Sequence, residues 1–324
     1  MNLSPVRKLV SLLALVAAFA SATTAFSAPP PGIPDGWSEG FVYANGIRIH
    51  CYHAVPARGK PVMVMVHGLS DIGLSWTTLT WKLQDAYDIY MVDTRGHGLT
   101  DPFMPGDDGD TLVKDVVAFV HTMKFEKPIL MGHSMGAATV MRLGAEQPDL
   151  AKAIIMLDPR LRPVGPPPAP STTAAGGQPG VSTPAAQSAR RPGGFFGTPE
   201  SLVEKNNSSF DELVATCRRQ TPKWDLVDCQ YWALSKKQYH GAYTPEAQEV
   251  MSGVMKLGDS LAKITVPVLI LKADATPEIR QANEEAARVI QHGKLVHIDG
   301  AGHNLHHDDL KRTVEVLNAF LSTL

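Results

Sequence analysis

Short runs of apolar residues alternate with longer stretches of helical periodicity along most of the chain. Asn45-Gly46 separates two apolar stretches, 41–44 and 47–52, and predicts a β-hairpin because both residues of its tight turn need positive φ. Six further apolar runs lie at 62–66, 89–92, 129–131, 153–157, 266–271 and 295–298. Helical patterns lie at 75–85, 110–123, 135–147, 277–291 and 309–321. Strands that are apolar on both faces and alternate with helices predict an α/β protein with a mostly parallel eight-stranded sheet flanked by helices.

One long insertion interrupts this alternation at residues 159–261, after the sixth strand. Residues 163–194 consist mainly of Pro, Ala, Gly, Ser and Thr, and they hold too few large apolar side chains to offset the entropy cost of ordering. We therefore expect a disordered loop there, followed by a helical cap that completes the insertion. The core domain is expected at 29–158 and 262–324.

The first 28 residues have the pattern of a secretory signal peptide. Arg7 and Lys8 precede a short apolar run at 9–20, and small residues follow it. The run is too short to span a bilayer comfortably, and no other long apolar stretch is present in the sequence. We expect an exported protein, periplasmic or secreted, with no stable membrane insertion once the signal is removed.

Charge, cysteine content and histidine spacing indicate which ligands, disulfides and metal sites to expect. The 30 Lys and Arg and 32 Asp and Glu give a formal net charge of −2 without a basic block, so we expect a small-molecule substrate and no nucleic acid. Cys217 and Cys229 can form a disulfide if the protein is exported, and two buried free thiols are the alternative. His306 and His307 lack the spacing of a zinc motif, and we expect no metal and no cofactor.

A nucleophile is predicted at the turn between one apolar run and one helical pattern. The pentapeptide Gly132-His133-Ser134-Met135-Gly136 has the pattern G-x-S-x-G in a strand-turn-helix context. Such a sharp turn strains the backbone of the central serine, and glycines two positions away leave room for it. The helix N-terminus directs amide dipoles at the reacting atoms. This context favours Ser134 as a nucleophile over a plain tight turn.

The remaining catalytic groups are predicted from loops that follow strands. His303 lies in a glycine-containing loop after the last strand, where its ring is free to act as the base. Asp274 and Asp158 each follow a strand and could orient the imidazole; we favour Asp274 and keep Asp158 as the alternative acid. The backbone amides of Leu69 and Met135 are expected to form an oxyanion hole.

These motifs together resemble the α/β-hydrolase superfamily. The elbow, the His67-Gly68 strand end, the D-x-R-G-H-G run at 93–98 and the loop at 300–304 carry the resemblance, which covers about 41–158 and 266–324. It implies the α/β-hydrolase fold with a cap after strand 6. The esterase, enol-lactonase and cofactor-free perhydrolase-like group is the most similar.

The resemblance also implies the order Ser, Asp, His, which Ser134, Asp274 and His303 satisfy. Many members have G-x-x-D after the seventh strand, whereas here Ala273 takes the place of the glycine and Thr276 that of the acid. The acid at Asp274 would therefore lie early in a shortened loop, which keeps Asp158 as the alternative.

The chemistry expected from these residues is acyl transfer. A serine nucleophile disfavours haloalkane dehalogenase and epoxide hydrolase reactions, which proceed through an alkyl-enzyme ester. We expect a serine hydrolase that cleaves carboxylic esters or lactones through a Ser-His-Asp triad and an acyl-enzyme. The alternatives are C–C bond or amide hydrolysis by the same triad, and a non-catalytic ligand-binding protein on the same fold.

Overall fold

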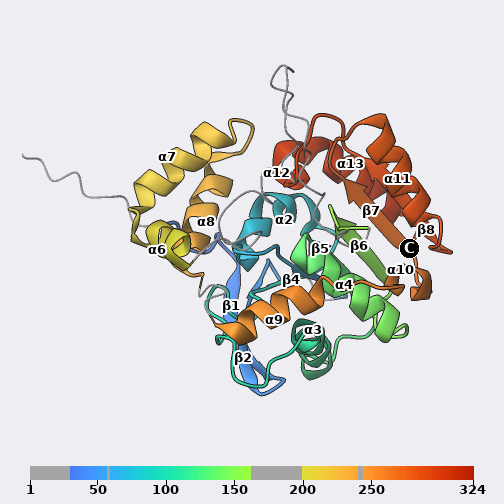
Figure 1. Cartoon of the computed structure of the whole chain (residues 1–324), viewed down its shortest axis with the longest axis horizontal. Coiled ribbons are helices and arrows are strands. Elements are labelled where there is room, and N and C mark those ends of the chain that lie inside the picture. Colours follow the sequence, from blue (N-terminus) through green and yellow to red (C-terminus); the bar gives the residue numbers. More distant parts are fainter. Residues whose placement is uncertain (1–29, 57–58, 162–198, 240–243) are drawn as a thin grey trace, which may run out of the picture. The chain divides into compact units, whose positions relative to one another are not determined.

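The computed structural model describes residues 30–56, 59–161, 199–239 and 244–324. The chain divides into Met1–Pro30 and Pro31–Leu324, and every element named below belongs to the second unit (Figure 1). The predicted signal peptide at 1–28 and the predicted disordered loop at 163–194 lie outside the described residues. Among the described helices, none has the length and apolar character needed to cross a bilayer.

A single eight-stranded sheet forms the centre of the second unit. Its strands are β1 (Ser38–Ala44), β2 (Ile47–His53), β3 (Val62–Val66), β4 (Asp88–Val92), β5 (Ile129–His133), β6 (Ala153–Leu157), β7 (Val268–Lys272) and β8 (Gly293–His297). They lie in the order β1-β2-β4-β3-β5-β6-β7-β8. The β1–β2 hairpin and the β2–β4 pair are antiparallel, and all other pairs are parallel. The predicted fold class, a mostly parallel eight-stranded sheet flanked by helices, is confirmed.

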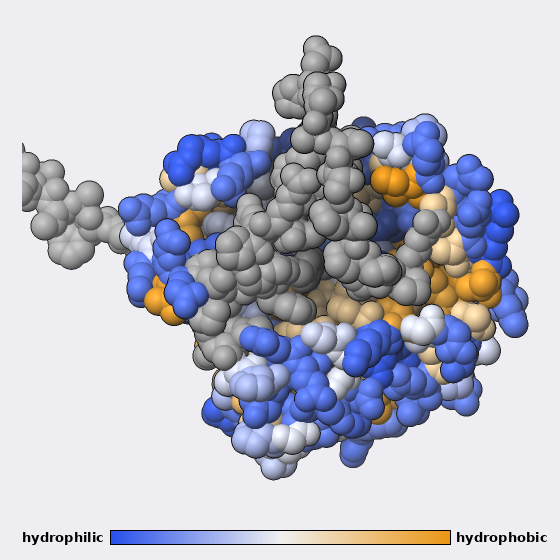
Figure 2. Space-filling view, viewed as in Figure 1, coloured by the Kyte–Doolittle hydropathy of each residue, from blue (hydrophilic) through white to orange (hydrophobic). Residues whose placement is uncertain are grey.

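Helices connect the parallel strands and flank the sheet (Figure 1). They are η1 (Gly73–Trp76), α2 (Thr77–Leu83), α3 (Thr111–Thr122), α4 (Met135–Glu146), α6 (Pro199–Asn207), α7 (Phe210–Gln220), α8 (Leu226–Lys237), α9 (Pro245–Val254), α10 (Ser260–Lys263), α11 (Pro277–Ala287), α12 (Leu305–Asp308) and α13 (Leu310–Leu321). On the visible face, the outer surfaces of the helices are predominantly hydrophilic (Figure 2). Helices α2, α3, α4 and α13 turn apolar side chains inward to the core clusters on the sheet.

Both faces of the sheet are buried, which explains why the strands are apolar without alternation. In β3, Met63 and Met65 join a cluster with side chains of α2 and α13, whereas Val64 and Val66 join a second cluster with side chains of α3 and α4. All four side chains are fully buried. Burial of one such side chain contributes about 1.5–3 kcal/mol, so every position of the strand favours this two-sided arrangement.

The insertion after β6 contributes helices of two kinds. Helices α6 and α7 pack against α8, and α8 packs on η1 and α2. Cys217 of α7 and Cys229 of α8 form a disulfide, the first of the two alternatives that the sequence left open. Helices α9 and α10 instead pack against α4, and α9 also packs against α3, where Gly109 and Gly253 are in close backbone contact. The later part of the insertion therefore lies on the sheet-flanking helices.

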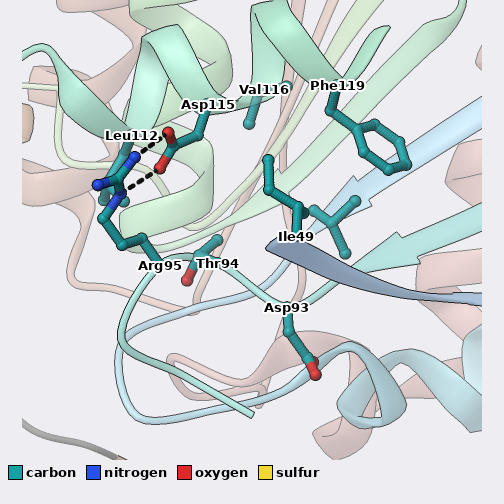
Figure 3. Close-up of a pocket in the computed structure, with 9 residues that line it drawn as sticks. Ile49, Asp93, Thr94, Arg95, Leu112, Asp115, Val116 and Phe119 are labelled. Atoms are coloured by element: carbon teal, nitrogen blue, oxygen red, sulfur yellow. Dashed lines mark hydrogen bonds and ion pairs between the residues drawn. The ribbon is translucent and has the colours of Figure 1, made fainter. Parts of the chain in front are cut away.

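The D-x-R-G-H-G turn after β4 is held by buried charges. Both carboxylate oxygens of Asp93 accept backbone N–H groups, from Gly73 at 2.6 Å and from Leu99 at 3.1 Å. The Arg95 guanidinium donates to both carboxylate oxygens of Asp115 on α3, at 2.7 and 2.9 Å, beside a small hollow lined by α3 side chains (Figure 3). These bonds fasten η1 and α3 to the carboxyl end of β4.

Candidate active site

Ser134 lies at the sharp turn between β5 and α4. Its φ of 52° and ψ of −108° are unusual for a residue with a side chain, and its N–H donates to Leu157 O at 3.0 Å. A Cβ on Gly132 would lie 2.2 Å from Gly136 O, and one on Gly136 would lie 2.0 Å from Val66 O. Only glycine fits at both positions, so the pattern G-x-S-x-G reflects close backbone packing as well as strain.

His303 contacts both Ser134 and Asp158. Its Nε2 lies 2.9 Å from Ser134 Oγ, and its Nδ1 lies 2.5 Å from Asp158 Oδ2. An ionised carboxylate only accepts hydrogen bonds, so Nδ1 carries the proton and Nε2 is left to accept the serine O–H. A continuous chain of hydrogen bonds thus runs from the serine through the imidazole to a carboxylate.

Asp158 is held from several directions at the end of β6. Its backbone, with φ of 45°, donates to Leu271 O at 2.7 Å. Oδ1 lies 2.5 Å from Lys272 Nζ and accepts the Ala273 N–H at 3.2 Å. Burial disfavours the charged carboxylate, but the His303 hydrogen bond and the Lys272 charge outweigh it and lower the pKa of Asp158. Asp158 is therefore ionised over the whole neutral range.

The favoured acid of the sequence analysis, Asp274, does not contact His303. It forms an ion pair with Arg280 and accepts N–H groups from Gly300 and Ala275, both at 2.8 Å. The hydrogen bond from Arg280 lowers the pKa of Asp274. The physical reason for its position is the short connection after β7, because Pro277 already begins α11. The structure thus brings the alternative acid, Asp158, to His303 and leaves Asp274 to fasten the start of the His303 loop.

The amides of Leu69 and Met135 lie on segments that meet at the elbow. Met135 is the first residue of α4, where N–H groups have no partner within the helix. The Leu69 and Met135 side chains pack in one apolar cluster. The loop before Leu69 is fixed by His67, whose Nδ1–H donates to Gly68 O at 2.7 Å and whose Nε2 accepts the Thr94 N–H at 3.0 Å. Burial lowers the pKa of His67, which keeps this tautomer neutral.

His133, the second residue of the elbow, supports the backbone of His303. Its Nε2–H donates to His303 O at 3.0 Å, and its ring is buried. Burial and the neighbouring His303 lower the pKa of His133 to about 3, so the ring is neutral at physiological pH. Sequence reasoning assigned this residue no role, because a contact 170 positions away along the chain leaves no local signal.

The loop that carries His303 is also held by residues of the cap. Asp308 accepts the Gly302 N–H at 2.7 Å and the Trp224 indole N–H at 2.8 Å. Lys223 Nζ donates to Gly300 O at 2.8 Å. The turn between α7 and α8, closed by the disulfide, therefore contacts the loop directly at Gly300 and, through Asp308 of α12, at Gly302. These contacts join residues 77 and 84 positions apart, so the sequence carries no local signal of them.

The chain belongs to the alpha/beta hydrolase family, whose model matches residues 63–316. This match and the fold establish membership of that family. Among the described residues, no group of three or more His, Cys, Asp or Glu side chains is arranged to hold a metal ion.

Curated relatives match only part of the chain. The 2-(acetamidomethylene)succinate hydrolase of Mesorhizobium japonicum is 31% identical over 98 residues, which cover 30% of this chain and 35% of that protein. The N-formylmaleamate deformylase of Pseudomonas putida is 31% identical over 121 residues, which cover 37% and 44%. Human epoxide hydrolase 4 is 27% identical over 116 residues, which cover 35% and 32%. The chain thus spans less than half the length of these relatives.

A solved structure supports the fold over a longer range. The enol-lactonase from Burkholderia xenovorans LB400 superposes with a TM-score of 0.58 and covers 87% of this chain and 100% of its own, at 19% sequence identity. At this level of identity the similarity shows the fold alone. The activity must be argued from the site.

Proposed function

We propose that the chain is an exported serine hydrolase that cleaves carboxylic esters or lactones through an acyl-enzyme on Ser134. The observation that carries this proposal is the hydrogen-bond chain from Ser134 Oγ through His303 to Asp158. It lies at an elbow whose strained backbone places the half-buried serine at the N-terminus of α4. A serine, a base and an orienting carboxylate at these distances form the arrangement that acyl transfer requires.

In this mechanism His303 Nε2 takes the proton of Ser134 as Oγ attacks the carbonyl carbon of the substrate. The amides of Leu69 and Met135 donate to the oxygen that becomes negative in the tetrahedral intermediate. His303 then gives its proton to the leaving alcohol, and an ester bond joins the acyl group to Ser134. Water, activated by the same imidazole, hydrolyses that ester and releases the carboxylic acid.

Asp158 has two tasks in this scheme, and its charge serves both. It holds the imidazole with Nδ1 protonated, and its negative charge stabilises the imidazolium that forms during attack. The His303 hydrogen bond and the Lys272 charge lower the pKa of the carboxyl group, so it stays ionised despite its burial. His133 supports the His303 backbone while remaining neutral, so it adds no charge that would oppose protonation of the base.

The names of the relatives support a second candidate function, cleavage of a C–N acyl bond, and raise a third, epoxide hydrolysis. Two of them are named for an acetamido substrate and for removal of an N-formyl group, which favours cleavage of a C–N acyl bond as the second candidate. Another is named an epoxide hydrolase. Serine at position 134 supports acyl transfer over epoxide opening, because a carboxylate nucleophile is needed for a hydrolysable alkyl-enzyme ester.

Export is proposed from two independent features. The first 28 residues have the pattern of a signal peptide, and the described residues contain the Cys217–Cys229 disulfide. Disulfides persist mainly in oxidising compartments, such as the periplasm or the medium. N-terminal sequencing of protein recovered from the periplasm tests this proposal, and an N-terminus at Met1 would contradict it.

The test of the catalytic proposal is a substrate panel with one matched variant. The mature protein is assayed with p-nitrophenyl acetate, an aliphatic lactone, an N-acyl amide and an aryl epoxide, and Ser134→Ala is assayed beside it. We expect turnover of the ester or the lactone and its loss in the variant, with circular dichroism showing the same fold. Turnover of the amide alone would favour the second candidate. Turnover that persists in Ser134→Ala, or none by folded wild type, would overturn the proposal.

A further inference from the structure

A buried lysine of the cap helix α8 contacts the loop beside the proposed oxyanion hole. Lys236 is only 6% exposed. Its Nζ donates to Ser70 O at 2.7 Å and to Ser70 Oγ at 3.0 Å. Lysines are rarely buried, because an ammonium group that leaves water must recover its hydration from the protein. Both hydrogen bonds go to one residue, which directly follows Leu69.

The backbone that receives these bonds is itself constrained. Ser70 has φ of 61°, a left-handed conformation that costs a non-glycine residue about 1 kcal/mol or more. The Asp71 N–H donates to Gly68 O at 3.2 Å, so residues 68–71 form a tight turn with Leu69 inside it. Lys236 Nζ donates two hydrogen bonds to Ser70 and so fixes the far side of the turn, while His67 fixes the near side by donating to Gly68 O. Leu69 lies between these two fixed points of the turn.

The surroundings of the Lys236 ammonium contain one carboxylate. Asp71 Oδ1 lies 3.7 Å from Nζ, and the Trp232 ring lies below the ammonium with its centroid 5.0 Å away. Lys205 of α6 and Tyr239 line the same small hollow beside Ser70. Burial lowers the pKa of Lys236 to about 8; the Asp71 charge opposes this change and Lys205 adds to it.

We propose that Lys236 is a positioning residue for the reaction, holding the Gly68–Asp71 turn so that the Leu69 N–H faces the oxyanion. This inference rests on the proposed function. It makes helix α8 part of the catalytic apparatus, because the cap then fixes the oxyanion loop at one end. The turn before α8 contacts the His303 loop at the other end through Trp224 and Asp308.

The first experiment compares Lys236→Met with Lys237→Met, which removes the same charge from an exposed neighbour on the same helix. We expect kcat on p-nitrophenyl acetate to fall about ten- to hundred-fold in Lys236→Met, with KM within about three-fold of wild type. Lys237→Met should retain wild-type kcat. A trifluoromethyl ketone forms a serine adduct that carries an oxyanion. Its affinity for Lys236→Met should fall by the same factor as kcat.

A purely structural role for Lys236 would produce a different pattern. Loss of a purely structural residue would lower the stability of the protein and the fraction of active sites. It would leave kcat per titrated site and the affinity for the ketone unchanged. Unchanged kcat and ketone affinity in Lys236→Met would therefore overturn the proposal. If Lys236→Met does not fold, Lys236→Gln takes its place, because the amide keeps an N–H donor without charge. We expect Lys236→Gln to show the same selective loss of ketone affinity, smaller in size.

The pH profile supplies a second readout. Lys236 is protonated below about pH 8 and loses its charge, and with it the attraction to Asp71, as the pH rises above that value. We expect wild-type kcat to decline above about pH 8 and expect Lys236→Met to lack this decline. A decline above about pH 8 that persists unchanged in Lys236→Met would contradict the proposal.

Backbone hydrogen exchange separates this inference from the proposed function. Peptides covering 68–71 should exchange faster in Lys236→Met than in wild type, whereas Lys237→Met should match wild type. If wild type turns over no ester but this difference is present, the proposed function fails, and only the hold of Lys236 on the 68–71 turn is shown. If wild type is active and neither exchange nor kcat changes in Lys236→Met, only the positioning role fails.

Discussion

At the scale of single residues, the carboxylate that contacts the imidazole is that of Asp158, which the sequence analysis kept as the alternative acid, and not that of the favoured Asp274. Asp158 uses one carboxylate oxygen for His303 and the other for Lys272 and the Ala273 N–H. Asp274 uses its oxygens for Arg280 and Gly300. A carboxylate at the end of β6 can therefore orient the same imidazole that the resemblance assigns to a carboxylate after β7.

Substitution of these two aspartates by asparagine separates the two assignments. Asp158→Asn should lower kcat by about 10⁴-fold, because an amide beside Nδ1 favours the wrong imidazole tautomer and removes the charge that stabilises the imidazolium. Asp274→Asn should change kcat by less than about ten-fold, since it only loosens the loop. Steady-state kinetics on one ester measure both effects. A larger loss of kcat in Asp274→Asn than in Asp158→Asn would assign the acid to Asp274.

At the scale of elements, the turn between α7 and α8 combines a covalent bond with contacts to the His303 loop. The disulfide spans 12 positions, and Lys223 and Trp224 lie between its cysteines. Closing a loop of this length lowers the entropy of the unfolded chain, which is worth about 3 kcal/mol on a chain-entropy account. The bond therefore stabilises the element that braces the proposed base.

Replacing both cysteines tests this stabilisation. Cys217→Ala with Cys229→Ala should lower the melting temperature by roughly 5–10 °C, which is what a loss of about 3 kcal/mol produces in a domain of this size. Calorimetry with and without a reductant is the measurement, and Cys51→Ala is the control, because Cys51 is a buried free cysteine. If the double variant melts at the same temperature as oxidised wild type, the disulfide contributes no stability.

At the scale of the whole molecule, neutral histidines buried behind the site make the fold sensitive to acid. His67, His133 and His306 are buried, and burial lowers the pKa of each below 6.5. Unfolded histidines take up protons near pH 6.5, so the unfolded state binds more protons than the folded state below that value. Stability is thus fully present above pH 6.5 and is lost as the pH falls.

Urea unfolding at pH 7 and pH 5 measures this effect. Each buried histidine should lower the free energy of unfolding by up to about 1.4 kcal/mol per pH unit below pH 6.5. The loss of free energy of unfolding between pH 7 and pH 5 should be smaller in His306→Gln, because one buried histidine is removed. His121 is exposed, so His121→Gln should lose as much as wild type. Equal stability of wild type at the two pH values would contradict the assignment of neutral buried rings.

The sheet could be predicted from the sequence because its signals are local. These signals are apolar runs of strand length, one Asn-Gly turn and the glycines of the elbow, and each determines the structure of neighbouring residues. Strands β3 and β6 begin and end where the apolar runs do. The helix expected at 75–85 is instead η1 followed by α2, which begin at Gly73 and Thr77 with Ile72 and Trp76 as their N-cap residues.

The supporting contacts of the site could not be predicted in the same way. Asp158 and His303 are 145 positions apart, and Lys236 and Ser70 are 166 positions apart. Such pairs are brought together by strand order and by the path of the insertion, which leave no periodicity in the chain. The shortened connection after β7 was the one local sign that Asp274 lies outside the usual position of the acid.

The most direct test of the account is the identification of the acyl-enzyme. The mature protein is mixed with p-nitrophenyl acetate, quenched in acid within the first turnover and analysed by intact and peptide mass spectrometry. We expect wild type to gain the mass of one acetyl group, located on Ser134, and Ser134→Ala to gain none. An acetyl group on another residue, or turnover without any covalent intermediate, would contradict serine acyl transfer at this site.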